Sequence, residues 1–449
     1  MDTLFSAAFS RKVPRYTSYP TAAQFSDRVG PTCHTAWLQR LPRSAAVSLY
    51  LHIPYCRQLC WYCGCHMRVA RDNHPLARYS DALLAEIRTV TGILGFRPWV
   101  DHIHWGGGTP TTLRPEDFRR IHEALHEAFI VRPGAEIAVE IDPRSLSDAM
   151  VATLADTGTT RVSFGVQDFD PDVQAAINRR QSFELTRDAV ERVRRAGIAS
   201  VNIDLVYGLP RQTEETLIRT VRQTLELEPD RLALFGYAHV PWLKRHQALI
   251  DEADLPGPEL RWQQAQAAAA LLAERGYVAI GIDHFARPGD RLARAAAAGR
   301  LRRNFQGYTD DESDAILGFG SSAISMFPDG YIQNAADIPA WLARAEAGNL
   351  TTARGIPLND EDRLRRDIIE RLMCDMRVDL RASLRRCPAS ARPVTDANPV
   401  LAELARAGLV SVDGPVIDIK PEARSLARIV AAAFDAYQGS AEGRHSLAV

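Results

Sequence analysis

The sequence predicts an α/β protein built on an incomplete (β/α)6 barrel. Short apolar or β-branched runs, each followed by an amphipathic stretch, span residues 46–53, 102–105, 136–141, 161–166, 201–207 and 231–237. This alternation is typical of βαβ units, which form parallel sheets. No glycine fingerprint of a dinucleotide-binding fold follows these runs, and 449 residues are enough for one large barrel with appendages.

The stretches between the predicted strands have helical periodicity. Apolar residues that recur three or four positions apart share one face of a helix. Two such sets are Phe118, Ile121, Leu125 and Phe129, and Leu217, Val221 and Leu225. We expect these helices to cover the sheet.

The first 43 residues have a different character, with no sustained period. They contain Pro14-Arg15-Tyr16-Thr17-Ser18-Tyr19-Pro20, a prolyl and aromatic run that excludes a helix. We expect residues 1–43 to form an arm over the active site. Residues 44–357 would then form the barrel and its extension.

The pattern changes again in residues 358–449. Helices are predicted over 360–376, 399–407 and 421–437, with two short strands around Asp413-Gly414. This is the order of a winged helix, so we expect a mostly helical, winged-helix-like module. The second helix offers only Arg406 beside Glu403 and no basic face, which favours packing over DNA binding.

Composition excludes several classes of protein. The 54 Lys and Arg residues nearly balance 55 Asp and Glu, which leaves no global field to hold nucleic acid or an anionic membrane. The longest uncharged stretch, Ala315 to Pro328, is too short to cross a bilayer. Asp2 lies where a secretory signal would carry positive charge. We therefore expect a cytoplasmic protein without membrane or nucleic-acid partners.

Four cysteines form a CxxxCxxCxC pattern directly after the first predicted strand: Cys56, Cys60, Cys63 and Cys65. A structural zinc site normally draws its ligands as two separated pairs, and no second pair exists here. A four-iron cluster instead uses a compact thiolate run, and three ligands leave one iron open. The pattern favours an iron–sulfur cluster over zinc or a merely reduced cysteine-rich loop.

A CxxxCxxC motif after the first strand of a barrel resembles the radical S-adenosylmethionine (SAM) superfamily. The resemblance implies that Cys56, Cys60 and Cys63 bind a 4Fe–4S cluster, that SAM chelates the fourth iron, and that its cleavage yields a deoxyadenosyl radical. Two later features agree with it. The run Trp105-Gly106-Gly107-Gly108-Thr109 follows the second predicted strand, and Glu140 ends the third, where barrel active sites assemble.

A closer resemblance, over nearly the whole chain, is to the oxygen-independent coproporphyrinogen III oxidase family. It is carried by the arm run 14–21, the complete CxxxCxxCxC, and the segments 165–169 and 202–210. The resemblance implies that Tyr50, Gly107, Glu140 and Ile324 contact the cluster-bound SAM. It implies that a second SAM is surrounded by Tyr62, Gly108, Thr109, Gln167, Arg179, Asp204 and Ala238. Cys65 is implied to be a catalytic cysteine that does not bind the cluster.

Read singly, two of these residues have plainer interpretations. Asp204 in an apolar run is equally compatible with a capped core acid, and Arg179 next to Arg180 with a solvated surface.

The activity implied by the resemblance is oxidative decarboxylation of two propionates of coproporphyrinogen III to vinyl groups, which gives protoporphyrinogen IX. The implied partners are that substrate, an external one-electron donor and an electron acceptor, and the implied state is a monomer. Four arginines in matching segments are candidates to bind propionate: Arg15, Arg57, Arg287 and Arg303.

Two other functions are compatible with parts of the sequence. One is a heme-binding, chaperone-like paralogue with a cluster but little turnover; Cys65 and the intact arm favour the oxidase over it. The other is a zinc-stabilised regulatory protein that uses the C-terminal module.

Overall fold

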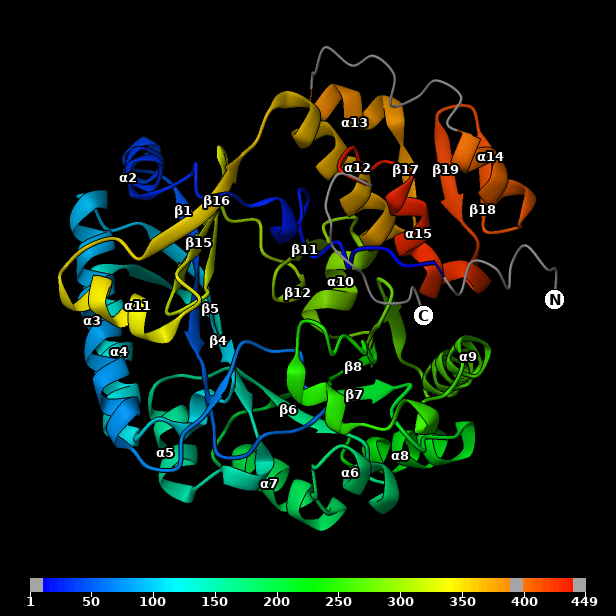
Figure 1. Ribbon diagram of the computed structural model, residues 1–449, viewed down its shortest axis with the longest axis horizontal. Helices are drawn as coiled ribbons and strands as arrows, with labels where there is room; N and C mark the ends of the chain where they lie inside the picture. The colour runs from blue at the N-terminus through cyan, green and yellow to red at the C-terminus, as the bar shows by residue number, and fades with distance from the viewer. Residues whose placement is uncertain (1–10, 388–398, 439–449) are drawn as a thin grey trace.

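The computed structural model describes residues 11–387 and 399–438, and its centre is a strongly curved sheet (Figure 1). Twelve strands form this sheet in the order β16-β15-β14-β13-β1-β4-β5-β6-β7-β8-β10-β9. Within the described residues the outermost strands, β16 and β9, do not pair with each other. The barrel is therefore incomplete, as predicted.

The six predicted strands are all present and lie side by side in chain order. They are β1 (Ala46–Ile53), β4 (Trp99–Gly107), β5 (Ile130–Ile141), β6 (Arg161–Gln167), β7 (Ser200–Tyr207) and β8 (Arg231–Gly236). Each pairs in parallel with the next. All six carboxyl ends therefore lie at one mouth of the barrel.

Helices cover the outer face of this parallel sheet (Figure 1). They are α3 (His74–Leu94), α4 (Pro115–Ala128), α5 (Asp148–Asp156), α6 (Pro171–Ala176), α7 (Phe183–Arg195), α8 (Glu214–Glu226) and α9 (Pro258–Glu274). The predicted apolar faces point inward: Phe118, Ile121, Leu125, Leu217 and Val221 are all fully buried. Polar side chains cap the first turn of α5 to α8, as where Ser182 accepts a hydrogen bond from the Leu185 amide.

The sheet is extended at both edges by strands that the sequence did not predict. Beside β1 lie β13 (Ala315–Phe319), β14 (Ile324–Phe327), β15 (Gly330–Asn334) and β16 (Thr352–Pro357), with α11 (Ile338–Glu346) between the last two. β13 pairs in parallel with β1 and the other three are antiparallel. Beside β8 lie β10 (His284–Ala286) and β9 (Val278–Ile280).

Five further short elements lie in the loops between the main strands. The cysteine loop is flanked by β2 (Tyr55–Cys56) and β3 (Arg68–Val69), and a hairpin is formed by β11 (Arg302–Asn304) and β12 (Gly307–Thr309). Helix α10 (Arg291–Ala297) precedes that hairpin.

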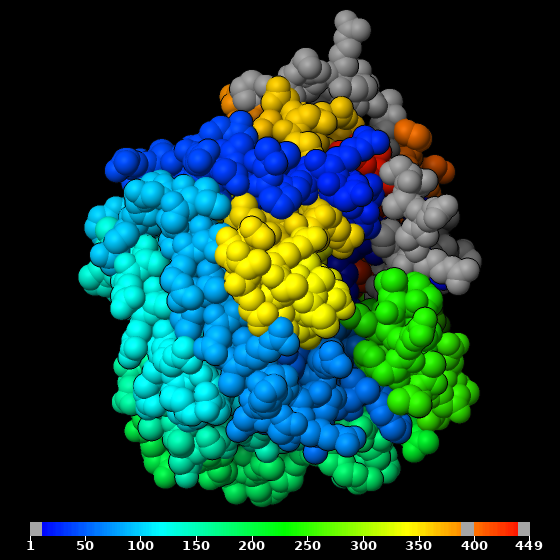
Figure 2. Space-filling view, turned by 60° about the vertical axis from the view of Figure 1, so that its left-hand side comes forward, coloured from blue at the N-terminus to red at the C-terminus, as the bar shows by residue number. Residues whose placement is uncertain are grey.

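The described part of the N-terminal arm contains more regular structure than predicted. Residues 11–20 form no helix, as expected, but a 3-10 turn (Ala22–Gln24) and α2 (Pro31–Arg40) follow. The helix is short and buries only His34, Trp37 and Leu38, so its period is too brief to detect in the sequence. In Figure 2 the dark blue arm crosses the molecule above the yellow extension strands and α11.

The C-terminal module follows the predicted order with two additional elements. It consists of α12 (Asp360–Asp375), β17 (Arg377–Asp379), α13 (Leu380–Arg386), α14 (Pro399–Arg406), β18 (Val410–Asp413), β19 (Val416–Ile419), a 3-10 turn (Pro421–Leu426) and α15 (Ala427–Ala432). The strand order β17-β19-β18 joins the hairpin to β17. The single helix predicted over 421–437 is instead the turn followed by α15. Parts of the predicted arm (1–10) and module (388–398, 439–449) lie outside the described residues.

One hydrophobic core connects these parts. It extends from Val13 and Tyr16 in the arm, through Leu49 and Ile203 in the barrel, to Ile429 in the C-terminal module. Among the described helices, none combines the length and apolar character that crossing a membrane would need.

Candidate active site

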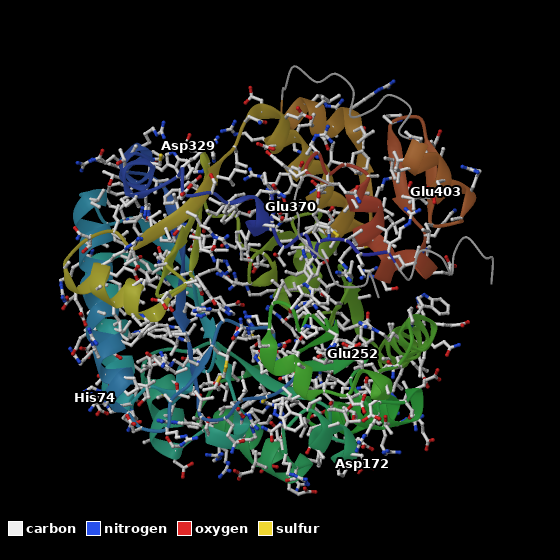
Figure 3. All side chains as sticks on the ribbon, in the orientation of Figure 1. His74, Asp172, Glu252, Asp329, Glu370 and Glu403 are labelled. Carbon is white, nitrogen blue, oxygen red and sulfur yellow. The ribbon has the colours of Figure 1, made fainter. Side chains whose placement is uncertain are left out.

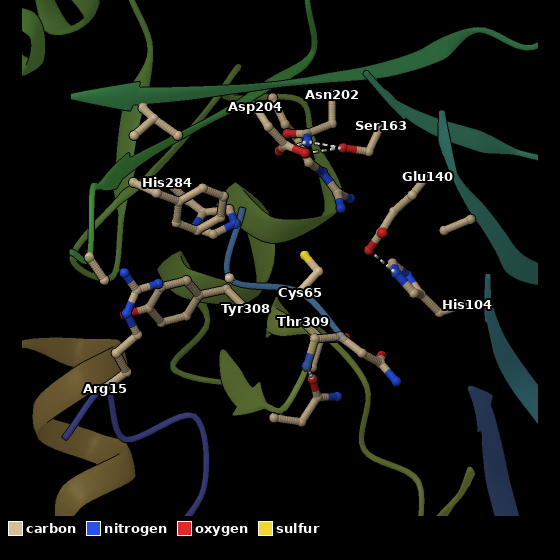
Figure 4. A pocket seen from close by; sticks show the side chains of 18 of the residues that line it. Arg15, Cys65, His104, Glu140, Ser163, Asn202, Asp204, His284, Tyr308 and Thr309 are labelled. Atoms are coloured by element: carbon tan, nitrogen blue, oxygen red, sulfur yellow. Dashed lines mark hydrogen bonds and ion pairs between the residues drawn. The ribbon is translucent and has the colours of Figure 1, made fainter. Parts of the chain in front are cut away.

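A cavity of about 680 Å³ opens at the mouth of the barrel (Figure 4). Active sites of barrel enzymes assemble at this end because the strands deliver side chains from several directions to one place. Seven of the predicted site residues line it: Tyr62, Cys63, Cys65, Glu140, Gln167, Asp204 and Ala238. The arm contributes Val13, Pro14 and Arg15 to the same cavity.

The backbone of the cysteine loop is held by side chains from distant segments. These bonds are Asn178 Nδ2 to Leu59 O (2.8 Å), Gln247 Nε2 to Tyr62 O (2.8 Å), His246 Nε2 to Cys63 O (2.7 Å) and Lys244 Nζ to Cys65 O (2.9 Å). Three of the four donors come from residues 244–247, which the sequence analysis did not identify. They follow β8 in the chain, and no local pattern marks them.

The three predicted cluster ligands each accept or share a hydrogen bond. Cys56 Sγ is 3.3 Å from Thr109 Oγ1. Cys60 Sγ accepts from Arg144 and Arg179, and Cys63 Sγ accepts from the Cys65 amide, all at 3.4 Å. Donors of this kind stabilise thiolates, which are the form that binds a metal cluster.

The thiols differ in how readily they ionise. Hydrogen bonding by Cys65, with the positive charges of Lys244 and Arg179, lowers the pKa of Cys63 to about 7. Burial raises the pKa of Cys56 to about 12. In the described part of the chain, no three His, Cys, Asp or Glu side chains are grouped closely enough to hold a single metal ion.

The glycine run at the end of β4 allows close packing beside the cysteine loop. A Cβ on Gly107, whose φ is 111°, would lie 2.6 Å from the His52 ring, and one on Gly106 would lie 2.7 Å from Glu140 Oε1. The Gly108 amide donates to Ile53 O at 2.8 Å. The end of β4 therefore has no side chains at these glycines and packs closely against β1 and Glu140. Its contact with SAM stays a prediction.

Glu140 is held as a carboxylate at one end of the cavity. His104 Nε2 donates to Oε1 at 3.1 Å (Figure 4). The Gly107 amide donates to Oε2, also at 3.1 Å. Although burial opposes ionisation, these donors and the neighbouring His104 lower the pKa of Glu140 below its ordinary value. An ionised carboxylate here can bind an ammonium group or ribose hydroxyls.

Asp204, on β7, lies in the same cavity with neutral partners. Its oxygens accept from Ser163 Oγ at 2.9 Å and Asn202 Nδ2 at 2.7 Å. Burial and the charge of Glu140 raise the pKa of Asp204. Asp204 is therefore a cavity-lining acid rather than one enclosed in the core.

The remaining predicted site residues lie outside the cavity lining. Arg179 is 5% exposed and contacts Cys60 and Asp142 Oδ2, the latter at 3.4 Å, so it is not a solvated surface residue. Tyr50 donates its hydroxyl proton to His52 Nδ1 at 2.9 Å. Ile324 lies on β14, opposite Gln333.

The other end of the cavity is cationic. Arg15 Nη2 donates to Gly236 O at 3.0 Å, and no carboxylate of the described residues forms an ion pair with it. Figure 4 shows Arg15 on the opposite side of Cys65 from Glu140. The two other lining arginines are neutralised, Arg161 by Glu136 and Arg231 by Asp290, both at 2.8 Å.

Further guanidinium groups lie behind Arg15. Arg303 stacks 4.4 Å from the centre of the Tyr308 ring and donates to Tyr16 O. Burial, together with the charge of Arg15, lowers the pKa of Arg428 in α15 to about 10. Sequence reasoning missed Arg428 because the family resemblance weakens beyond about Arg366.

Three of the four arginines proposed from the sequence as propionate ligands do not line the cavity: Arg57, Arg287 and Arg303. Arg57 faces away from it and donates to Asn73 Oδ1 at 2.6 Å. Arg287 is half-exposed, with Glu228 at 3.9 Å. All three lie in segments that match the family, but only the tertiary structure shows which way a side chain points.

Comparisons with known proteins agree with this architecture. Residues 50–224 match the radical SAM superfamily. The chain is 49% identical, over 98% of its length and 97% of the relative's, to an oxygen-independent coproporphyrinogen III oxidase of Bradyrhizobium diazoefficiens. It is 41% identical, over 94% and 93%, to the protein of that name from Escherichia coli.

A solved structure matches as well. Coproporphyrinogen III oxidase from Escherichia coli, described as a radical SAM enzyme, superposes with a TM-score of 0.89 at 40% identity and covers 95% of this chain and 100% of its own. The fold, the cysteine loop and the barrel-mouth cavity thus define a radical SAM enzyme. Within that class the chain belongs to the oxygen-independent coproporphyrinogen III oxidase family.

The cofactors of this family are a 4Fe–4S cluster and SAM, and the residues present fit them. Three thiols occupy one loop fixed by hydrogen bonds, and guanidinium groups contact Cys60 Sγ, where they offset negative charge. The ionised Glu140 and the bare backbone of Gly107 lie beside that loop. Cys56, Cys60 and Cys63 would hold the cluster.

Proposed function

We propose that this protein converts coproporphyrinogen III to protoporphyrinogen IX without oxygen. Each of two propionate side chains loses one hydrogen atom from its β-carbon, then carbon dioxide and one electron, and becomes a vinyl group. The near-full-length identity to oxidases of this name supports the assignment. The structural observation that carries it is a single cavity with thiols and Glu140 at one end and an arginine without an ion-pair partner at the other.

Bound cluster and SAM supply an electron and a radical able to abstract hydrogen from unactivated carbon. The chain's own residues position the reactants. Glu140, kept ionised by His104 and Gly107, would bind a cationic or hydroxyl group of SAM. Tyr50, through His52, and Ile324 would complete that site, while Gly108, Thr109, Gln167, Asp204 and Ala238 would serve a second SAM.

The substrate's carboxylates call for fixed cations near an apolar surface. Arg15 is the lining guanidinium that no carboxylate of the described residues neutralises, and Arg428 and Arg303 raise the positive potential behind it. Val13, Pro14, Phe235 and Leu243 supply apolar lining for the pyrrole rings. We therefore propose that Arg15 binds a propionate of the substrate.

Besides supplying Arg15, the arm would help to exclude water from the site. A carbon radical must be separated from solvent and from adventitious hydrogen donors. Tyr16 donates to Asp435 Oδ2 at 2.9 Å and Arg303 donates to Tyr16 O, so the arm is fixed to both the C-terminal module and the β11–β12 hairpin. This placement is compatible with an arm that closes over bound substrate.

The remaining partners follow from the chemistry. We propose that the reaction uses an external one-electron donor and an acceptor for the electrons released with each vinyl group. We also propose that the protein is a monomer in the cytoplasm and has no nucleic-acid or membrane partner. The heme-binding paralogue is not favoured, because the near-full-length relatives carry the oxidase name.

An anaerobic assay tests the proposed function. The reconstituted protein is incubated with SAM, dithionite and coproporphyrinogen III, and the porphyrins are separated after oxidation. We expect the two-vinyl product and SAM consumption that depends on substrate. Heme bound in stoichiometric amount without vinyl product would instead indicate the chaperone-like function.

A further inference from the structure

A second hollow lies beside the cysteine loop, separate from the catalytic cavity. It is bounded by the loop, by the segment that leads into α3, and by the chain between α6 and α7; Figure 3 labels His74 at the start of α3 and Asp172 in α6. Five arginines line it: Arg57, Arg68, Arg71, Arg144 and Arg180. We call it the arginine hollow.

The arginine hollow carries a surplus of positive charge. Arg144 is paired with Asp142 at 2.7 Å, but the other four form no ion pair with any carboxylate of the described residues. Arg57 donates to neutral acceptors, among them Asn73 Oδ1. Asp72 is the single acidic residue in the lining, and its Oδ1 already accepts from the His74 amide at 3.0 Å.

The hollow also exposes apolar side chains. Val69 and Leu185 line it, and each is 37% exposed. Exposed apolar residues surrounded by arginines are typical of surfaces that bind another protein. Arginines that lack carboxylate partners select a partner with acidic side chains, because opposite charges speed encounter and exclude wrong partners.

This surface is connected directly to a predicted cluster ligand. Arg144 lines the hollow and donates from Nη2 to Cys60 Sγ at 3.4 Å. Leu59, next to Cys60, also lines it. A protein seated here would therefore be separated from the Cys60 sulfur by a single layer of side chains, while the substrate cavity stays unobstructed.

We propose that the arginine hollow is the docking surface for an acidic electron-carrier protein. The proposal rests on the proposed function, which requires an electron from outside the chain. In the encounter the carrier is oxidised by one electron and the enzyme's 4Fe–4S cluster is reduced by one electron, with no proton or ligand exchanged at the surface. Interfaces between electron-transfer proteins are small and weak. Because exposed charges would hold this complex together and salt screens them, the affinity should fall strongly as salt rises.

Charge reversal tests the proposal. The variant Arg68→Glu/Arg71→Glu/Arg180→Glu changes exposed residues that form no ion pair with the described residues, and none belongs to the catalytic cavity. The matched control Arg43→Glu/Arg222→Glu/Arg275→Glu makes the same change in net charge at exposed sites outside the hollow. Circular dichroism and iron content verify that each variant is folded and loaded.

The probe is purified flavodoxin, an acidic protein with a low-potential flavin. Its dissociation constant is measured by titration at low and moderate salt, and electron transfer is followed by flavin absorbance in a stopped-flow instrument. We expect affinity and transfer rate to fall at least about tenfold in the hollow variant, from the loss of three favourable charge contacts, and little in the control. Turnover with dithionite should be unchanged in both.

Other outcomes separate the two proposals. Equal flavodoxin affinity and transfer rate in the hollow variant and its control would overturn the docking site. A wild-type protein that binds flavodoxin through the hollow but forms no vinyl product with dithionite would contradict the proposed function and leave the docking site standing. If charge reversal impairs folding, the milder Arg68→Gln/Arg71→Gln/Arg180→Gln variant replaces it. We again expect weaker flavodoxin binding and slower electron transfer than in the control.

Discussion

The two ends of the barrel-mouth cavity are built from opposite charges. At one end lie the cysteine loop and Glu140, whose pKa is lowered by His104 and Gly107. At the other end lies Arg15, whose pKa is lowered by burial and by Arg303 although Asp283 and Tyr207 oppose the shift. Because buried charges are costly unless paired, each end is prepared for a ligand of opposite charge.

We propose that this difference separates the cofactor from the substrate. The thiol end is made by consecutive elements of the barrel and fits a cluster with a cationic ligand. The cationic end is made by Arg15 of the arm, with the β11–β12 hairpin beside it and Arg428 of the C-terminal module close to Arg15, and it would fit a carboxylate-bearing substrate. Loss of either end should therefore have distinct consequences for binding and for chemistry.

The largest effect is expected from Cys56→Ser. A serine oxygen cannot replace the thiolate, so the cluster should not assemble and product formation should fall to background. Iron content, the visible absorbance of the cluster and SAM cleavage measure this. Cys33→Ser, in α2 and far from the loop in sequence, is the control and should retain all three. A cluster and SAM cleavage that persist in Cys56→Ser would disprove the ligand assignment.

A smaller loss is expected from Glu140→Gln, which keeps the shape of the side chain and removes its charge. A hydrogen bond between charged groups contributes about 2 to 3 kcal/mol, so SAM affinity should weaken about 30- to 150-fold. Equilibrium binding to the cluster-loaded enzyme measures the change. Iron content should be normal, and unchanged SAM affinity would place Glu140 outside the SAM site.

Arg15→Leu should act on the other end of the cavity. Loss of one guanidinium–carboxylate contact should raise KM for coproporphyrinogen III about tenfold, while SAM affinity stays close to wild type. Arg15→Lys keeps the charge but not the planar fork and should be intermediate. If KM for SAM rises instead, the assignment of the two ends is reversed.

The smallest effects concern stability and pH. The lowered pKa of Glu140 means that its carboxylate stabilises the fold above its ordinary pKa of 4.5, and this contribution is lost as the pH falls through the lowered value. The raised pKa of Asp204 acts oppositely: its ionised form opposes folding once the pH rises above the ordinary 3.8 and through the raised value.

Thermal unfolding of the apoprotein from pH 4 to pH 8 compares these two acids. At pH 8, Glu140→Gln should lower Tm and Asp204→Asn should raise it, each by about 1 to 2 °C. Both differences should shrink toward pH 4. Shifts of the same sign in the two variants would contradict the opposite charge states.

Much of the fold could be predicted because its signals are local. The runs that became β1 and β4 to β8, and the faces of α4 and α8, follow from hydrophobic periodicity within a few residues. The strands β13 to β16 were missed because they are short and lie between turns. Their pairing depends on β1, more than 250 residues earlier in the chain, as where Leu317 lies beside Leu49.

The site divides in the same way. The thiols and glycines stand in compact motifs, so the sequence alone was enough to predict them as site residues. Lys244 and Arg428 have no such local signal, because the groups they interact with are distant in the sequence. Lys244 donates to the carbonyl of Cys65, and the charge of Arg15 lowers the pKa of Arg428. Arg57 was predicted for the cavity but faces the arginine hollow instead.

The sequence by itself determined the chemistry that is available: three thiols on one loop, glycines at a strand end and a carboxylate two strands away. Such residues are recognisable because their spacing is fixed by the backbone over a few positions. The tertiary structure alone decided which charged side chains meet. Arg161 forms an ion pair with Glu136, whereas Arg15 forms none with the described residues and stays available to bind a ligand. Long-range packing, which no local pattern records, turned a set of reactive residues into a cavity with two different ends.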